Sequence, residues 1–435
     1  MALGGGNFTS QNKILPGAYI NVISAARASA TLSDRGVVAL PIALDWGKQE
    51  EVFTITSEDF QKNSLKLLGY DYSAPEVMPL REIFLNAVKV HVYNLNAGGV
   101  KATSALATAK YAGVRGNALK YVISANIDDE SKKDVALYLG TTKIDSQTVA
   151  NASELVDNDF VTYNKEATLT ETAGTSLTGG TNGSELTGAS YQAALDKLEA
   201  HHNFNALVCP TTEASTIALF VAFTKRMRDQ VGVKFQTVVY RTLADYEGIV
   251  SVENSVNGAD EYAAIYWVAG AIGGCAINKS NTNKKYDGEL DIDCKHTQSE
   301  LEAGILDGKF MFHKVEDVIR VLMDINTFVS HTPEKGEIFS NNQVVRVADQ
   351  RANDTGSIFN TNYFGKVQND KSGRVSYWNE LVSHARQMER IRAIETYDAD
   401  SLTVEQGEKK TSVVVNEVIT VIGTMEKLYM TTVVN

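Results

Sequence analysis

Cysteine and proline are scarce in this sequence. Its 435 residues include three cysteines and six prolines. The cysteines are Cys209, Cys275 and Cys294, which lie far apart and form no CxxC pair. A sparse, odd set of this kind argues against a disulfide framework and against a zinc site built on paired cysteines. It favours free, buried thiols in a reducing cytoplasm.

Long apolar runs are also missing. The longest apolar stretch, Ala263–Ile277, is too short and too rich in glycine to cross a bilayer. The first residues, MALGGGNFTSQNK, lack the basic segment followed by an apolar one that marks a secretory signal. We therefore expect synthesis in the cytoplasm and no membrane insertion.

Positive charge is in the minority. The chain has 41 Lys and Arg against 53 Asp and Glu, which gives a formal net charge of −12. A general nucleic-acid binder needs a basic footprint, so this balance argues against a nucleic-acid partner. Hydrophobic residues make up 43% and charged residues 22%, which is typical of a globular protein of this length with two or three domains.

Catalytic signatures such as GxSxG and HExxH are absent, and the most suggestive loop is Gly179–Gly183, GGTNG. Its backbone N–H groups could cradle a phosphate. However, no Lys-Ser/Thr pair follows, and GxGxxG is missing, so a turn is the favoured interpretation. The alternative, an α/β nucleotide-binding protein or enzyme that uses this loop, stays open. The sequence otherwise predicts no catalytic, cofactor-binding or metal-ligating residues, and so no cofactor.

Four acidic residues, Asp287, Glu289, Asp291 and Asp293, fall at every second position. On a strand they would share one face. The glycine and the distal Glu of an EF-hand loop are missing, so calcium binding is not favoured. We interpret the run as a solvated or partner-facing acidic stripe.

What the chain does contain is an alternation of helical and strand patterns, which predicts a multidomain α/β (α+β) fold. Buried strands are expected at Gly36–Leu44 and Ala206–Cys209, and Ser57 is expected to cap a helix that Gly69 ends. Small residues at Ala269, Gly270, Gly273 and Gly274 predict close packing of a helix against its neighbours. The stretch Gly98–Gly180 reads as short strands and turns without a clear helix.

These patterns divide the chain into five parts. We expect an N-terminal arm at 1–25, a core α/β domain split between 26–97 and 181–340, an inserted β-rich domain at 98–180, and a C-terminal domain at 341–435 with a helix over Tyr377–Ile394.

The C-terminal domain closes with an unusual stretch. Residues 411–435 are rich in Val, Ile, Thr and Tyr, and Gly423 divides them into two predicted strands, Ser412–Ile422 and Lys427–Val434. A further isolated strand is expected at Ala18–Ser24. A strand at the end of the chain either closes the sheet of its own domain or adds to the sheet of another copy, and we favour the second interpretation here. The residues predicted to exchange are Ala18, Tyr19, Ile20, Asn21, Val22, Ile23, Leu428, Tyr429, Met430, Thr431, Thr432 and Val433.

Seven short segments, taken in order, resemble one known family. They are LPGAYINV (15–22), GGTNG (179–183), NALVCP (205–210), WVAGAIGG (267–274), NKSNTNKKYDG (278–288), DINTF (324–328) and YFGKVQND (363–370). The set resembles the tail sheath proteins of contractile phages and of phage-tail-like bacteriocins of the R-type, diffocin-like kind, in the short form of Gram-positive bacteria. Gly98–Gly180 is the part that resembles the family least.

The resemblance implies a structural protein and not an enzyme. A sheath subunit forms a helical homopolymer around an inner tail tube, and the sleeve contracts to drive the tube through a cell envelope. Its other implied partners are baseplate and tail terminator proteins. The implied location is a phage tail or bacteriocin particle that is assembled in bacterial cytoplasm and released by lysis. A surface-layer subunit is a further self-assembling alternative, which the missing signal disfavours.

The resemblance also implies that the domain with the termini lies against the tube. On the helix Tyr377–Ile394, the side chains of Trp378, Leu381, Ala385 and Met388 would face its own sheet. Arg386 and Arg390, four residues apart, then share an outer face, and we predict that they contact the tube. The competing interpretation is an ordinary ion pair with Glu389 or with the acidic stripe of a neighbour.

Overall fold

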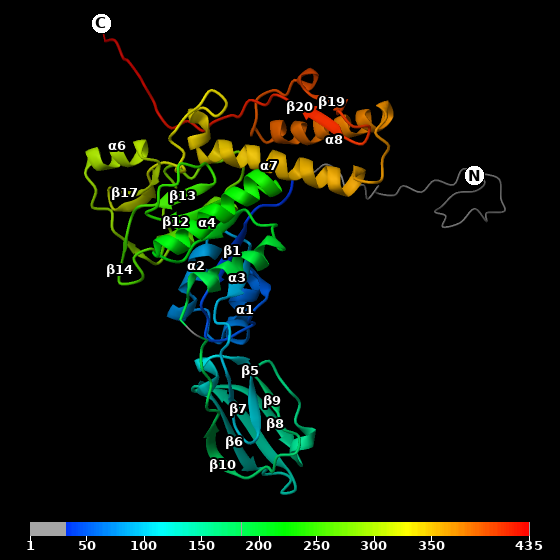
Figure 1. Ribbon diagram of the computed structural model, residues 1–435. Coiled ribbons are helices and arrows are strands. Elements are labelled where there is room, and N and C mark those ends of the chain that lie inside the picture. Colours follow the sequence, from blue (N-terminus) through cyan, green and yellow to red (C-terminus); the bar gives the residue numbers. More distant parts are fainter. Residues whose placement is uncertain (1–31, 184, 435) are drawn as a thin grey trace, which may run out of the picture. The chain divides into compact units, whose positions relative to one another are not determined.

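The computed structural model describes residues 32–183 and 185–434 (Figure 1). The chain forms two compact units. The first contains Ser33–Asn353, Ile391–Glu395 and the residues from Thr420 onward, and the second contains Asp354–Arg390 and Thr396–Ile419. The strand predicted at Ala18–Ser24 lies outside the described residues.

The main sheet of the first unit has seven strands, of which six run parallel. In order across the sheet they are β16 (Lys309–Phe310), β13 (Ile249–Val252), β12 (Gln236–Tyr240), β11 (Ala206–Val208), β1 (Val37–Ile42), β3 (Lys89–Asn94) and β2 (Val52–Thr56). The edge strand β2 runs antiparallel to β3. The central strand β1 reads as a continuous apolar run because helices cover both of its faces.

Successive residues of β1 belong to opposite cores. Val38 and Leu40 pack in one hydrophobic cluster, and Ala39 packs in the other. The first cluster holds side chains from α1 (Ser57–Leu68), α2 (Met78–Phe84) and α5 (Ala264–Gly274), and the second holds side chains from α3 (Gly188–Glu199) and α4 (Ala214–Arg226). The alternating helical and strand pattern of the sequence therefore gives the expected layered α/β core.

Helix α1 begins one residue earlier than its predicted cap implies. The oxygen that accepts from the Asp59 backbone N–H is Thr56 Oγ1, at 3.1 Å, so Thr56 and not Ser57 is the cap. Both residues have a hydroxyl, and the sequence alone does not separate them. Gly69 ends the helix in the left-handed conformation, as expected.

Helix α5 confirms the prediction of close packing at its small residues. A Cβ placed on Gly274 would lie 1.8 Å from the Asn86 carbonyl oxygen, and one on Gly270 would lie 2.5 Å from that of Ile83. These carbonyls belong to the end of α2 and the turn after it. The backbones of the two helices touch because α5 has no side chains at these positions.

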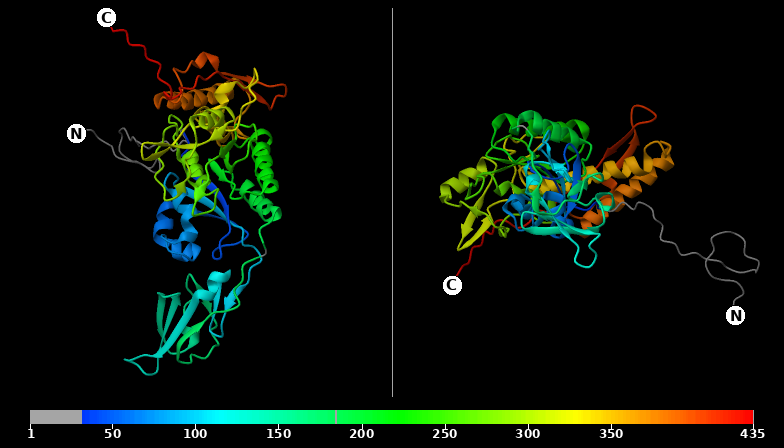
Figure 2. Two further views of the ribbon diagram at one scale, coloured as in Figure 1. Left: turned by 90° about the vertical axis from the view of Figure 1, so that its left-hand side faces the viewer. Right: turned by 90° about the horizontal axis from the view of Figure 1, so that it is seen from below.

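Strands β4–β10 form a separate module inside the first unit. A four-stranded antiparallel sheet contains β10 (Thr172–Ser176), β6 (Leu119–Ala125), β7 (Lys133–Leu139) and β8 (Thr142–Val149), and a three-stranded one contains β4 (Lys101–Thr103), β5 (Ala107–Ala112) and β9 (Val161–Tyr163). The two sheets enclose their own core. The two connecting segments run side by side and are joined at Val100 and Thr181 (Figure 2).

The remaining strands and helices of the first unit follow α5 in the sequence, except for β14, which precedes it. They are β14 (Val256–Asn257), β15 (Asp291–Ile292), α6 (Gln298–Leu306), β17 (Phe312–Val315), β18 (Val318–Val321) and the greater part of α7 (Asn342–Ile358). Residues 286–290, between an isolated bridge at Lys285 and β15, belong to no strand, so the four acidic side chains do not share the face of one strand. Asp287, Glu289 and Asp291 are nevertheless exposed, as expected of a solvated acidic run, and Asp293 is half-buried. Asp287 accepts from Trp267 Nε1 at 2.8 Å, and Glu289 pairs with Arg81 at 2.7 Å.

The second unit is built on α8 (Lys371–Arg390) and a hairpin of β19 (Thr403–Gln406) and β20 (Val413–Asn416). The helix predicted at Tyr377–Ile394 therefore begins and ends earlier. The predicted strand Ser412–Ile422 shortens to β20 followed by an isolated bridge between Val421 and Ile394. Residues 427–434, which we call the C-terminal tail, are described but form no helix or strand.

Candidate functional site

The β19–β20 hairpin, which we call the terminal hairpin, is a sheet with two strands. Its register runs from Thr403 opposite Asn416 to Gln406 opposite Val413. Within the described residues no third strand joins it, so the outer edge of each strand lacks a neighbouring strand. A two-stranded sheet is marginal by itself, and an open edge is a template for another strand.

Helix α8 supports this hairpin. Trp378 Nε1 donates to the Leu402 carbonyl at 3.0 Å, just before β19. Asn369 Nδ2 donates to the carbonyls of Lys410 and Ser412, at 2.9 and 2.7 Å, and so fixes the turn before β20. Trp378 is half-buried and not fully buried, because it lies at the margin of the hairpin, whereas Leu381, Ala385 and Met388 are buried as predicted.

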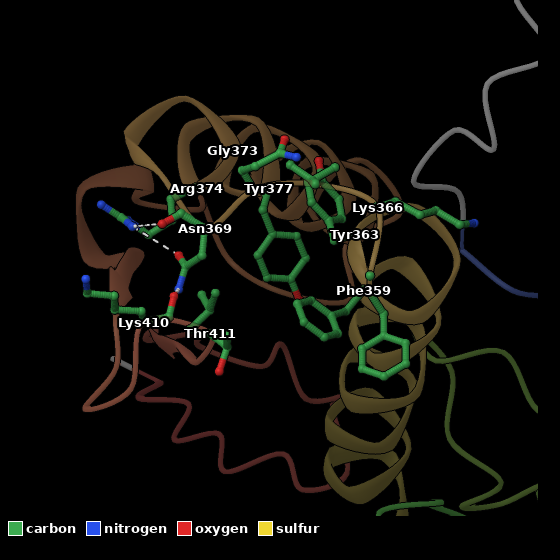
Figure 3. A pocket seen from close by; sticks show the side chains of 14 residues that line it. Phe359, Tyr363, Lys366, Asn369, Gly373, Arg374, Tyr377, Lys410 and Thr411 are labelled. Atoms are coloured by element: carbon green, nitrogen blue, oxygen red, sulfur yellow. Dashed lines mark hydrogen bonds between the residues drawn. The ribbon is translucent and has the colours of Figure 1, made fainter.

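A pocket of about 430 Å³ lies beside the start of β20 (Figure 3). We call it the aromatic pocket. Phe359, Tyr363 and Tyr377 line it, with ring centroids 4.8 Å apart for the two tyrosines and 5.6 Å apart for Phe359 and Tyr377. Phe364, which also lines the pocket, is 69% exposed. The lining is thus rich in apolar rings that face solvent at one side.

The rest of the pocket lining is cationic. Lys366, Arg374 and Lys410 line it, and none of its lining residues is acidic. Arg374 Nη1 donates to Asn369 at its carbonyl and its side-chain oxygen, both at 3.0 Å, which holds the guanidinium beside the turn. The pocket lining is therefore a local patch of positive charge in a chain whose formal net charge is −12.

Local backbone geometry creates the aromatic pocket. The chain leaves α7 through a π turn, Phe359–Tyr363, and then reverses at Gly365, whose φ of 69° favours glycine. Asp370 Oδ1 accepts from the Gly373 backbone N–H at 2.8 Å and so caps the next helix, α8. The sequence reading missed the pocket. The signal that could have found it is the cluster of Phe359, Tyr363 and Phe364 just before this helix start.

The C-terminal tail leaves the first unit from a well-anchored base. Glu395 N donates to the Thr420 carbonyl at 2.8 Å, Ile422 N to the Ala393 carbonyl at 3.1 Å, and Thr282 Oγ1 to Glu426 at 2.8 Å. Beyond that point the predicted exchange residues are open to solvent. Leu428, Tyr429, Met430 and Val433 are 77–88% exposed, and Thr431 and Thr432 are exposed as well.

The other predicted exchange residues, Ala18, Tyr19, Ile20, Asn21, Val22 and Ile23, lie outside the described residues. Arg386 and Arg390 are both exposed on α8, opposite its buried face. Arg386 Nη1 donates to Glu389 Oε2 at 2.7 Å, and this hydrogen bond holds the pKa of the Glu389 carboxyl below its ordinary value. Arg386 thus makes the intrahelical pair with Glu389 that was the competing interpretation.

The Gly179–Gly183 loop is a poor phosphate cradle. The N–H groups of Gly180 and Gly183 donate to the side chains of Asn117 and Asn96, and that of Thr181 donates to the Val100 carbonyl. Helix α3 begins only at Gly188, so its N-terminus does not follow the loop directly. The loop is the return from the inserted module, as the favoured interpretation had it.

The thiols do not suggest chemistry either. Cys209 and Cys275 are buried, and burial raises the pKa of each thiol. Cys294 is only half-buried, and burial raises its pKa to about 11. Over residues 32–183 and 185–434, no group of His, Cys, Asp and Glu is arranged to hold a metal ion. None of the helices described there is both long and apolar enough to cross a bilayer.

Four family models match consecutive parts of this chain. They are the tail sheath protein Gp18 domain III N-terminal region (residues 35–95), the phage tail sheath protein beta-sandwich domain (97–182), the phage tail sheath protein central domain (184–327) and the phage tail sheath C-terminal domain (334–435).

Individual relatives agree. The crystal structure of the sheath tail protein of Desulfitobacterium hafniense is 34% identical, covers 95% of this chain and 99% of its own, and superposes with a TM-score of 0.82. The phage-like element PBSX protein XkdK of Bacillus subtilis is 33% identical over 81% of each chain. The contracted helical sheath of the anti-feeding prophage shares the fold, with 10% identity, a TM-score of 0.57, and coverage of 96% and 98% of the two chains.

The layered core, the inserted sandwich, the open hairpin and the exposed tail define a multidomain structural protein of the kind that assembles with copies of itself. With the matches above, the chain belongs to the phage tail sheath family, as the ordered segments predicted. It is a structural subunit of a contractile tail sheath. Nothing supports the alternative of a nucleotide-binding protein or enzyme at Gly179–Gly183.

Proposed function

We propose that this subunit polymerises into a helical sleeve by exchanging terminal strands between copies. The observation that carries the proposal is the C-terminal tail. It leaves an anchored base, and the large apolar side chains of Leu428, Tyr429, Met430 and Val433 are almost fully exposed. Apolar side chains in such a run are costly in water and favour burial against a partner.

The terminal hairpin is the acceptor in this scheme. Among the described residues, each of its strands has an outer edge without a strand neighbour, so two edges are available for exchanged segments. One would take a tail, and the other would take residues Ala18–Ile23 of another copy. Backbone hydrogen bonds would supply the affinity, as in other cases of strand addition.

Exchange between the donor tail of one copy and the acceptor hairpin of the next is a heterologous contact. Heterologous contacts form a closed ring only when successive rotations bring the last copy back to the first. Otherwise they form a helical filament. Strand joints would also let rigid domains repack without dissociation. The energy of contraction would then be stored in the assembly, with no need for a bound nucleotide and no enzymatic activity.

The polymer would surround an inner tail tube and meet baseplate and tail terminator proteins at its ends. We place residues 341–435 innermost, with Arg386 and Arg390 toward the tube, and the inserted module 98–180 on the outside. The remaining assignments are 1–25 as an exchanged arm and 26–97 with 181–340 as the core. The subunit would be made in bacterial cytoplasm and leave in a phage tail or bacteriocin particle upon lysis.

Deletion of residues 427–435 tests the exchange. We expect a folded chain with an unchanged melting profile that no longer forms tubes in electron micrographs. A matched chain in which only Lys427 is changed to Ala should still polymerise. Normal tubes from the shortened chain, or its failure to fold, would mean that the tail serves its own subunit.

A further inference from the structure

The aromatic pocket adjoins β20, one of the two open strands. Lys410, Thr411 and Val413 line it from the hairpin, and Phe359, Tyr363 and Tyr377 line it from the other side (Figure 3). A strand that pairs with the outer edge of β20 directs every second side chain to the face on which Val413 lies. That face leads into the pocket.

The pocket lining restricts what can enter. Its rings favour an apolar side chain, and a lining with three cations and no acidic residue disfavours a lysine or arginine. Methionine suits such a site because its flexible thioether fills irregular spaces and makes favourable contacts with aromatic rings.

The C-terminal tail has one face of this composition. In an extended strand, Leu428, Met430, Thr432 and Val434 lie on one side, and Lys427, Tyr429, Thr431 and Val433 lie on the other. The first side has no charge, whereas the second begins with a lysine. The eight tail residues span about 26 Å when extended at roughly 3.3 Å per residue.

We propose that the aromatic pocket is a side-chain anchor for the tail of a second copy, with Met430 seated among Phe359, Tyr363 and Tyr377 and Leu428 beside it. The inference rests on the strand exchange proposed above, and it adds a determinant of register. A strand that slips by one residue would present Lys427, Tyr429 and Thr431 to the cationic, aromatic lining. Backbone pairing thus provides affinity, and the pocket selects one register and one face.

Cysteine cross-linking between two different chains tests this arrangement. One full-length chain has Thr411→Cys at the pocket, and the other has Met430→Cys and a size tag. Both also have Cys294→Ser, because Cys294 is the half-exposed native thiol. Under mild oxidation we expect a mixed covalent dimer, at least five-fold more abundant than with Thr431→Cys, the matched position on the opposite face.

Equal yields from positions 430 and 431, or no mixed dimer from either, would overturn the anchor. A chain with both Thr411→Cys and Met430→Cys tests which copy supplies the tail. If this chain cross-links only within itself, the pocket holds the tail of its own chain and not that of a second copy.

Charge in the tail provides an independent measurement. Met430 and Thr431 are exposed in the single chain, so Met430→Lys and Thr431→Lys should both fold normally. The pocket lining holds three cations, so we expect Met430→Lys to lower the yield of tubes about ten-fold and Thr431→Lys to lower it less than two-fold. If tail deletion abolishes tubes but the two lysines act alike, strand exchange stands and the anchor is wrong. If tail deletion has no effect, both proposals fail.

Discussion

Arg346 is buried inside the first unit, where it pairs directly with the carboxylate of Asp324. Its Nη2 donates to Asp324 Oδ2 at 2.8 Å, and both side chains are almost completely buried. Asp324 also accepts from the Asn281 backbone N–H and from Asn342 Nδ2, both at 2.9 Å. The pair joins α7 to the loops that follow α5 and β18.

Arg346→Met should therefore destabilise the protein strongly. It leaves Asp324 buried without a cation, and breaking one side of a buried pair costs about 3–5 kcal/mol. Lys62→Met is the matched control, since its partner Glu58 is exposed and such pairs contribute about 0–1 kcal/mol. Urea unfolding of both variants measures the difference, and similar losses would contradict a structural role for the buried pair.

Arg386 and Arg390 carry the prediction about the tube. Changing both to Glu should leave the subunit folded, because both are exposed, and should prevent extended sheath from forming around tubes. Polymer should then appear only in the contracted form, without a tube. The control is Lys48→Glu with Lys62→Glu, which changes the net charge equally at another exposed surface. Electron micrographs of co-expressed sheath and tube provide the measurement, and extended sheath at normal yield would make both arginines ordinary surface residues.

At the residue scale, the sequence predicts the exposure of a side chain better than it predicts the partner that this side chain contacts. The exposure of Arg386 and Arg390 follows from helical spacing alone. The acidic residues at 287 and 289 alternate like a strand, yet Trp267 and Arg81 bind them from distant elements. Partners separated by many residues leave no local signal.

Helix α5 shows how a whole element depends on the absence of side chains. Gly274→Ala would place a methyl group 1.8 Å from the Asn86 carbonyl oxygen, so α2 and α5 would have to separate. We expect a loss of about 1–3 kcal/mol, as for other overpacked cores. Gly356→Ala in α7 is the control. It meets nothing within 4 Å and should be neutral or stabilising by up to about 1 kcal/mol. Equal melting temperatures would argue against the close contact.

The inserted module should be dispensable for folding of the rest. It has its own two sheets and core, and its connecting segments run side by side. Replacing residues 98–180 by a short Gly/Ser linker should leave a folded core that still forms tubes. Trp46, which packs on Tyr111 and Phe160 of the module, should be changed to Gln in the same chain to avoid an exposed ring. A folded core that forms no tubes would contradict this prediction.

Most of the core elements could be predicted because their apolar residues repeat with a helical or strand period. Helix α7 could not, since its buried face includes Asn342, Gln343, Arg346 and Asp349 and so lacks an apolar stripe. Strand β8 was missed for a related reason, because most of its residues are polar and at least partly exposed. The aromatic pocket depends on a π turn and a left-handed glycine, which no periodicity reveals.

For the whole molecule, the account is that the copies of a sheath subunit are joined by shared strands. The sequence composition favours a tail that reaches another copy, and the described tail pairs with no strand among residues 32–183 and 185–434. The terminal hairpin supplies an open edge of the complementary kind. The family assignment supports assembly into a sheath, and the open hairpin edge and the exposed tail support shared strands as the proposed joint between copies.

The most direct test is a helical reconstruction of the assembled polymer by cryo-electron microscopy, at a resolution that traces the backbone of residues 427–434. The account predicts that this tail crosses to a neighbouring copy and pairs as an added strand along β20 of its terminal hairpin, with Met430 in the aromatic pocket. A tail that folds back on its own subunit, in a polymer whose copies share no strand, would contradict it.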